Sequence, residues 1–244
     1  MRRPTRQRSS SLALACVALA LPCTAAAQAY QCRVPASVPQ PRAESGKAVR
    51  APIDGYTLAI SWSPEYCRGK ERNPADHLQC AGSMGQFGFV VHGLWPEGSR
   101  GAPQYCAPVA APPASVIRRQ LCRTPTVALI AHEWTKHGSC IARRPETYFK
   151  IANIISDSLR YPAMERLARE GQRAPDTLTA GSLRRALATA NPGRPAASFG
   201  LLLSRSGWLK EVKVCLDRRF RPRNCPARQR GPRDSAPLKI WRGL

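Results

Sequence analysis

The sequence has few acidic residues and few histidines, and it contains no long apolar run. Its 244 residues include 15 Asp and Glu against 38 Lys and Arg, so the formal net charge is +23. This imbalance favours a polyanionic partner, either a nucleic acid or an anionic surface. No apolar stretch reaches the roughly 20 residues that span a bilayer, so no transmembrane segment is predicted. Hydrophobic residues make up 43% of the chain, which is typical of a folded protein.

The N-terminus has the pattern of a secretory signal peptide. Residues 1–10 carry four Arg and no acidic residue, a short apolar stretch covers 12–22, and small residues follow. We expect cleavage near Ala27, which predicts a periplasmic or secreted protein. The organisation that we expect is a signal peptide at 1–27, an irregular Pro/Ala-rich lead-in at 28–52, and one domain at 53–244 with a basic C-terminal tail.

The cysteines show no Cys-x-x-Cys spacing, which is the spacing typical of structural zinc sites. Removal of the signal peptide would leave eight: Cys32, Cys67, Cys80, Cys106, Cys122, Cys140, Cys215 and Cys225. An even number in an exported chain predicts up to four disulfides. Spacing alone suggests only the Cys215–Cys225 pair, because Pro222 lies in a plausible turn between them.

Periodicity predicts strands at both ends of the chain and helices in the middle. The expected strands cover 56–62, 87–91, 209–216 and 238–242. The expected helices cover 124–138, 145–160, 162–170 and 179–190. The intervening segments 68–85 and 101–113 are polar or Pro/Ala-rich and are expected to be loops. This order indicates a single α+β domain.

Two short segments hold three of the four histidines. The first, VHGLWPEG at residues 91–98, places His92 at the end of a predicted buried strand, with Trp95 three residues further on. The second, HEWTKHGSC at residues 132–140, falls on a predicted helix. A single histidine is more often structural, but this concurrence in a basic, cysteine-rich chain favours a functional site.

Helical spacing groups the side chains of the second segment in pairs. His132 and Lys136 are four residues apart and share a face, and so are Glu133 and His137. A carboxylate one turn from a histidine can orient its ring and raise its pKa, while the lysine supplies fixed positive charge. Proton-transfer groups beside fixed positive charge suit phosphoryl chemistry, in which charge develops on phosphate oxygens.

A zinc hydrolase is the main alternative interpretation, because His132-Glu133 opens like the zincin motif. That motif needs a second histidine at i+4 on the same helical face. Here His137 stands at i+5, about 140° around the helix from the first. Lys136 occupies the i+4 place, and a protonated amine does not bind zinc. The sequence therefore predicts no metal site.

The segments HGLWPEG and HEWTKHGSC resemble the two active-site segments of the ribonuclease T2 family, secreted acid-type endoribonucleases with an α+β fold. The resemblance extends more loosely from Tyr56 to Pro226, through ISWSPEYC at 60–67 and WLKEVKVCLD at 208–217. It implies a central, mainly antiparallel sheet with several helices, stapled by disulfides. It also implies the pairs Cys67–Cys80 and Cys140 with Cys106 or Cys122, and it leaves the partner of Cys32 open.

The resemblance assigns a role to each polar residue of the two segments. His137 would take the proton from the ribose 2′-hydroxyl, and His92 would protonate the departing 5′-oxygen. His132 would bind phosphate, and Glu133 and Lys136 would stabilise the transition state. The products would be 2′,3′-cyclic phosphate and then 3′-phosphate ends, formed with low base specificity and without a metal or other cofactor. DNA lacks the attacking hydroxyl and should not be cleaved.

Trp95 and Glu97 are the candidates for substrate binding. Trp95 could stack on a base or pack beneath the site, and Glu97 stands where many family members carry an aspartate that contacts the base. We expect a monomer whose partner is RNA. Two other hypotheses remain: a binding protein that has lost catalysis, which the complete residue set disfavours, and an exported toxin that uses the same chemistry.

Overall fold

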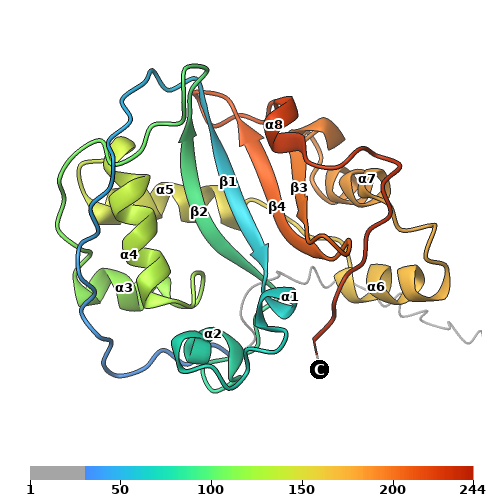
Figure 1. Ribbon diagram of the computed structural model, residues 1–244, viewed down its shortest axis with the longest axis horizontal. Helices are drawn as coiled ribbons and strands as arrows, with labels where there is room; N and C mark the ends of the chain where they lie inside the picture. Colours follow the sequence, from blue (N-terminus) through green and yellow to red (C-terminus); the bar gives the residue numbers. More distant parts are fainter. Residues whose placement is uncertain (1–30, 244) are drawn as a thin grey trace, which may run out of the picture.

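A four-stranded antiparallel sheet forms the centre of the protein. The computed structural model describes residues 31–243, so the predicted signal peptide lies outside the described residues. The strands are β1 (Gly55–Trp62), β2 (Phe89–Glu97), β3 (Phe199–Leu203) and β4 (Leu209–Leu216), in the spatial order β2-β1-β4-β3 (Figure 1). The expected α+β fold with an antiparallel sheet is therefore confirmed.

One face of the sheet carries apolar side chains and packs on helix α5 (Pro145–Asp157), which runs behind the sheet in Figure 1. Alternate residues of the strands, among them Leu58 and Ile60 of β1, are fully buried on this face. Helix α5 packs against this face through buried residues at helical spacing, namely Tyr148, Phe149, Ala152 and Ile155. The opposite face of the sheet is left for polar side chains.

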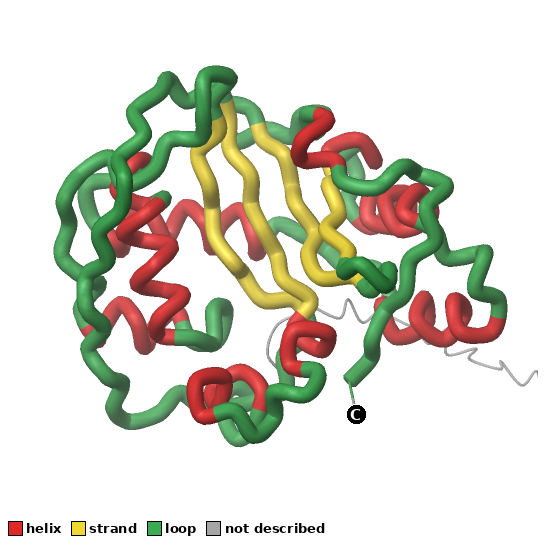
Figure 2. Tube along the Cα trace, in the orientation of Figure 1, coloured by secondary structure: helices red, strands yellow, loops and turns green. Residues whose placement is uncertain are grey.

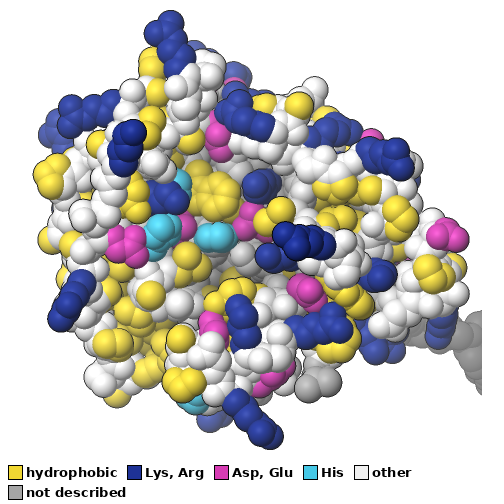
Figure 3. All heavy atoms as spheres, in the orientation of Figure 1, with side chains coloured by type: hydrophobic (Ala, Val, Ile, Leu, Met, Phe, Trp, Pro, Cys, Tyr) yellow, Lys and Arg dark blue, Asp and Glu magenta, His cyan; other side chains and the backbone are white. Residues whose placement is uncertain are grey.

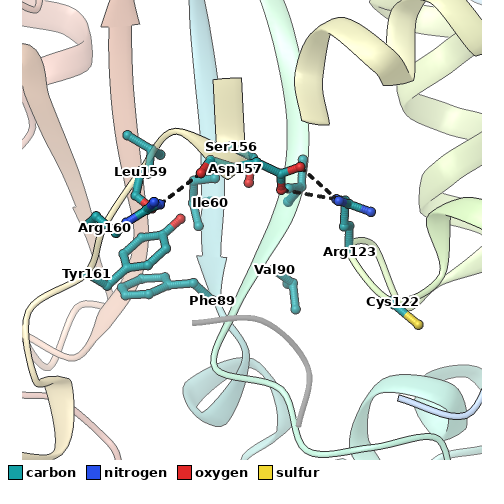
Figure 4. Close-up of a pocket in the computed structure, with 11 residues that line it drawn as sticks. Ile60, Phe89, Val90, Cys122, Arg123, Ser156, Asp157, Leu159, Arg160 and Tyr161 are labelled. Atoms are coloured by element: carbon teal, nitrogen blue, oxygen red, sulfur yellow. Dashed lines mark hydrogen bonds and ion pairs between the residues drawn. The ribbon is translucent and has the colours of Figure 1, made fainter. Parts of the chain in front are cut away.

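A small pocket lies at the end of this apolar layer (Figure 4). Phe89 of β2 stacks on Tyr161, with ring centroids 4.4 Å apart. An ion pair between Arg123 and Asp157, 2.9 Å long, closes one side. Ile60 also lines this pocket, so the pocket lies on the face of the sheet that packs on α5.

Helices flank both edges of the sheet (Figures 1 and 2). Helices α3 (Ala114–Gln120) and α4 (Val127–Lys136) lie beside β2, and α6 (Met164–Arg173) and α7 (Ala180–Ala190) lie beside β3. A capping box between Thr179 and Ser182 begins α7. The short elements are α1 (Ser63–Cys67), α2 (His77–Cys80), α8 (Ala227–Arg230) and 3₁₀ turns at Pro74–Asp76, Gly138–Cys140 and Ala196–Ser198.

Several element boundaries differ from the sequence predictions. Helix α4 begins at Val127 rather than at 124, because the Thr124 hydroxyl donates to the Val91 carbonyl and ties that residue to β2. The predicted strand at 238–242 does not form. Lys239 makes a single bridge with Trp208, and the apolar Leu238 and Ile240 serve packing rather than strand pairing.

Four disulfides join the described cysteines: Cys32–Cys122, Cys67–Cys80, Cys106–Cys140 and Cys215–Cys225. The pair predicted from local spacing and the pairs implied by the resemblance are confirmed. The Cys106–Cys140 bridge ties the loop before α3 to the 3₁₀ turn that follows α4, so it fixes the backbone at the end of the second histidine segment. Cys32 fastens the N-terminal segment to the end of α3.

Residues 31–54, called the strap below, contain no helix or strand. The strap runs past α3 and α4 to the start of β1 (Figures 1 and 2). Besides its disulfide, it accepts hydrogen bonds from the Arg118 side chain at Pro35 and Ala36. Further along, Val49 forms one isolated bridge with Gln104. These contacts hold the strap against the helical edge beside β2.

Candidate active site

A β-bulge in β2 brings His92 and Trp95 to the same face of the sheet. Side chains of a regular strand alternate, so residues three apart would point to opposite faces. In β2, Gly93 pairs with Ala59 and Val91 pairs with Ile60, which leaves His92 as the extra residue. The bulge lets the His92 ring approach the edge of the Trp95 ring, with centroids 5.1 Å apart. His92 therefore lies inside the strand, not at its end as predicted.

Two carboxylates face the His92 ring from different elements. Its Nδ1 is 2.7 Å from Oε2 of Glu211 on β4, and its Nε2 is 3.6 Å from Oε1 of Glu133 on α4. Burial lowers the pKa of His92, but the hydrogen bond to Glu211 and the charges of Glu133 and Glu211 outweigh burial and raise it. The surroundings of His92 thus favour its protonated form.

Glu133 is buried between α4 and β2. Its Oε2 accepts a hydrogen bond from the indole N–H of Trp95, 2.8 Å away. A side chain on Gly93 would lie 1.9 Å from the same oxygen, so the close approach requires glycine there. Burial raises the pKa of Glu133 to about 7, against the lowering effect of His92 and the Trp95 hydrogen bond. This carboxyl can therefore carry a proton near neutral pH.

His137 lies at the C-terminal end of α4 and has different surroundings. Its Nδ1 is buried and has no hydrogen-bond partner among residues 31–243. The ring centroid is 5.6 Å from that of Trp95 and 6.4 Å from that of His132. Burial, followed by the charges of Lys136, His132 and His92, lowers the pKa of His137 to about 3. These surroundings favour a neutral ring.

Helix α4 also contributes His132 and Lys136 to the site. Nδ1 of His132 is 2.7 Å from Oε2 of Glu44, a residue of the strap. Lys136 ends α4, and its carbonyl accepts a hydrogen bond from the Tyr105 backbone N–H. Figure 3 shows histidine side chains gathered around a large hydrophobic side chain in a hollow of this face, with basic side chains beside them.

The structure thus brings together His92, His132, Glu133, Lys136 and His137, together with Trp95. The Trp95 ring lies beside both the His92 ring and the His137 ring, and its indole N–H donates to Glu133. Its stacking on a base stays a prediction. Glu97 is buried at the far end of β2. There it accepts hydrogen bonds from Thr57 at 2.8 Å and Arg228 at 3.3 Å, and its contact with a base also stays a prediction.

Sequence analysis missed Glu211 and Glu44 as members of the site. A signal for Glu211 was present, because Glu211 and Lys213 are two residues apart in β4 and therefore share one face of the strand. Lys213 lies over the Trp95 ring, 5.5 Å from its centroid, and 3.9 Å from Glu211. No comparable pattern marks Glu44, whose approach to His132 depends on the path of the irregular strap.

Between residues 31 and 243, His, Cys, Asp and Glu side chains form no group of three or more suited to hold a metal ion. Within the same range, no helix combines the length and apolar character needed to cross a membrane.

Comparison with known proteins identifies the class. The Ribonuclease T2 family matches residues 53–225. A ribonuclease of Aeromonas hydrophila is 31% identical over 183 residues, which cover 75% of this chain and 78% of that protein. A probable ribonuclease of Haemophilus influenzae is 34% identical over 129 residues, 48% of this chain and 47% of that protein.

Solved structures share the fold at lower identity. RNase NT in complex with 5′-AMP superposes with a TM-score of 0.57 at 20% identity, over 78% of this chain and 98% of that one. An RNase-related protein from Calystegia sepium gives a TM-score of 0.56 at 18% identity, with the same coverage. The fold and the histidine site define a disulfide-bonded α+β enzyme. The chain belongs to the ribonuclease T2 family and is an RNA-cleaving endoribonuclease.

Proposed function

We propose that this protein is an exported ribonuclease that cleaves single-stranded RNA by histidine acid–base catalysis without a metal ion. The opposite surroundings of its two central histidines carry the proposal. His92 is paired with two carboxylates, whereas His137 lies among cations. An acid and a base that act together at one pH need pKa values that are pushed apart, and these surroundings push them in the required directions.

In the first step, His137 accepts the proton of the ribose 2′-hydroxyl, and the oxygen attacks the adjacent phosphorus. The bond from phosphorus to the 5′-oxygen breaks, and His92 gives that oxygen the proton from Nε2. The products are a 2′,3′-cyclic phosphate and a free 5′-hydroxyl. The negative phosphodiester raises the proton affinity of His137 when substrate binds, so the low pKa of the free enzyme suits a base that acts only on bound RNA.

Charge on the phosphate oxygens is stabilised from α4. Lys136 and His132 supply positive charge, with His132 binding the phosphate. Glu133 acts in its protonated form, since its pKa is raised to about 7 and a buried neutral carboxyl can donate a hydrogen bond to a phosphoryl oxygen. An ionised carboxylate at this position would repel the phosphate. In a second, slower step, water opens the cyclic phosphate to a 3′-phosphate.

The wider properties follow from charge, disulfides and the attacking group. The formal net charge of +23 supports binding to the RNA backbone, with strong salt dependence and low base specificity. Four disulfides support export to the periplasm or the medium after cleavage of the N-terminal signal near Ala27. We propose that the exported protein acts as a monomer and spares DNA, which has no 2′-hydroxyl.

The test is cleavage of a long RNA by the purified mature protein in excess EDTA. Cyclic-phosphate ends, intact DNA in a parallel reaction and inactivity of the His92→Ala, His137→Ala double variant are expected. A correctly disulfide-bonded protein that binds RNA but does not cleave it between pH 4 and pH 8 would contradict the proposal and favour a binding protein. Cleavage that is lost in EDTA and restored by zinc would point to a metal enzyme.

A further inference from the structure

Glu211 is a carboxylate buried in a central strand of the sheet. It lies on β4, between β1 and β3, and only 4% of its surface is exposed. Burial of a carboxylate costs free energy unless hydrogen bonds and opposite charges offset it. Its partners are Nδ1 of His92 at 2.7 Å and the Lys213 ammonium at 3.9 Å. The shorter of these contacts is to a residue of the active site.

We propose that Glu211 is a positioning residue for RNA cleavage, which holds the Nδ1–H of His92 so that Nε2 carries the proton given to the leaving oxygen. This inference rests on the proposed function. Glu211 lies on the opposite side of the His92 ring from Glu133, which faces Nε2 at 3.6 Å. The carboxylate of Glu211 accepts a hydrogen bond from the Nδ1–H throughout, and it takes up no proton during the reaction.

The tautomer of His92 depends on this contact. A neutral imidazole carries one proton, on whichever nitrogen has the better acceptor. Apart from Glu211, the group beside Nδ1 is the Ser61 hydroxyl on β1, at the 3.5 Å limit of a hydrogen bond. Without the carboxylate, the ring could place its proton on either nitrogen and could rotate. Proton transfer to the 5′-oxygen would then require a rarer arrangement of the ring.

The titratable and charged groups around His92 come from β4 and from α4 with the residue that follows it. Glu211 and Lys213 face it from β4, Glu133 faces it from α4, and His137 stands just after α4. Glu211 makes the hydrogen bond, while burial and Lys213 oppose protonation of the ring. Replacement of Glu211 by a neutral side chain therefore removes the carboxylate that is hydrogen-bonded to His92 and leaves the charge of Lys213 in place. The alkaline limb of the pH–rate profile, which reports loss of the His92 proton, should move to lower pH.

The test compares Glu211→Gln with wild type in the full mature protein. On RNA, kcat should fall about 10–1,000-fold, which is at or below the range for removal of a general acid, with KM nearly unchanged. The alkaline limb and the NMR titration of the His92 ring should both move to lower pH. On a nucleoside 3′-phosphodiester with a nitrophenol leaving group, the variant should approach the wild-type rate, because that leaving group needs no proton. Glu165→Gln, in an exposed pair on α6, is the matched control and should change none of these.

Each outcome decides the matter. Unchanged alkaline limb and His92 titration, or equal losses on both substrates, would show that Glu211 is only structural. If Glu211→Gln does not fold, Glu211→Asp replaces it, because aspartate keeps the negative charge but is shorter by one methylene. A lower kcat on RNA, with recovery on the nitrophenyl substrate, would support the inference. An unaltered kcat on RNA would contradict it. Failure of wild type to cleave RNA, or full activity of His92→Ala, would instead overturn the proposed function.

Discussion

His92 sits between two carboxylates, whereas His137 follows Lys136 at the end of α4 and lies beside His132. The two imidazoles are chemically identical, but His137 is buried whereas the His92 side chain is 32% exposed. Strand β4 and helix α4 each supply one carboxylate to the His92 ring, and the end of α4 supplies cations to the His137 ring. The pKa of His92 is raised because its carboxylates outweigh burial, and the pKa of His137 is lowered because burial and the neighbouring cations act in the same direction.

The largest expected effect separates the two roles. Both His92→Ala and His137→Ala should lower kcat on RNA by about 10²–10⁴-fold, since each removes one proton-transfer group. On a nucleoside 3′-phosphodiester with a nitrophenol leaving group, His92→Ala should recover much of the wild-type rate. His137→Ala should stay slow on both substrates, because the 2′-hydroxyl must still lose its proton. Steady-state kinetics on the two substrates measure this.

The reverse pattern would exchange the assignments. Recovery of His137→Ala, with His92→Ala slow on both substrates, would make His92 the base. Equal losses in both variants on both substrates would mean that neither ring acts on the leaving group alone. His77→Ala, which removes the one histidine outside both motifs, serves as the control and should behave as wild type.

The Gly93→Ala substitution tests the part of the site that contains Glu133. The new methyl group would lie 1.9 Å from Oε2 of Glu133, so this buried carboxyl must move. We expect a loss of kcat of about 10–100-fold, with a loss of about 1–3 kcal/mol in the free energy of unfolding from overpacking. Gly88→Ala just before β2 is the matched control, because its methyl group would meet Trp62 at an ordinary 3.7 Å. Equal effects of the two substitutions would show that the loss comes from the strand backbone.

The opposite pKa shifts also predict opposite effects on stability. His137 is neutral in the folded protein down to about pH 3, whereas an unfolded histidine binds a proton below about pH 6.5. Folding stability is therefore lost as the pH falls through this window. His137→Gln removes this loss. Between pH 7 and pH 4, the difference in free energy of unfolding between His137→Gln and wild type should therefore shift by about 2–4 kcal/mol in favour of the variant.

His92 should show the reverse dependence. Its raised pKa contributes stability below the unfolded value, and this contribution is lost as the pH rises through the folded value. His92→Gln should therefore cost more stability at acidic than at alkaline pH. Urea unfolding at several pH values measures both variants, with His77→Gln as the control. If the free energies of unfolding of both variants change in parallel with pH, then the surroundings of His92 and His137 are not electrostatically opposite.

The sequence shows which residues form the site better than how they meet. Helical spacing predicts that Glu133 faces His137, but this prediction is wrong: Glu133 contacts His92 and Trp95, and the pKa of His137 is lowered. The two motifs are brought together as the resemblance implies. The bulge at His92 is not visible in the sequence, because it depends on the register with β1. For the same reason Glu211 looked like one polar residue of a strand. Its partnership with His92 joins residues 119 positions apart.

Elements with weak local signals were missed in the same way. β3 is a five-residue edge strand whose apolar run has no alternation, and pairing with β4 defines it. Helix α3 spans only Ala114–Gln120 and is held by packing. The strap has no periodicity at all, so its path is determined by Cys32 and by contacts with α3 and α4. Tertiary contacts, rather than local propensity, determine these parts.

The smallest expected effect comes from the strap. Glu44 is 43% exposed, lies outside the segment that matches the family, and forms an ion pair with His132, the proposed phosphate ligand. The carboxylate competes with phosphate, but an exposed pair is worth only about 0–1 kcal/mol. Glu44→Gln should therefore lower KM for RNA by up to about five-fold at low salt, with kcat unchanged and the effect lost at high salt. Glu165→Gln, in another exposed pair, should leave KM unchanged. A higher KM in Glu44→Gln would mean that Glu44 orients His132 for phosphate, and the strap would then support the α4 side of the site rather than oppose it.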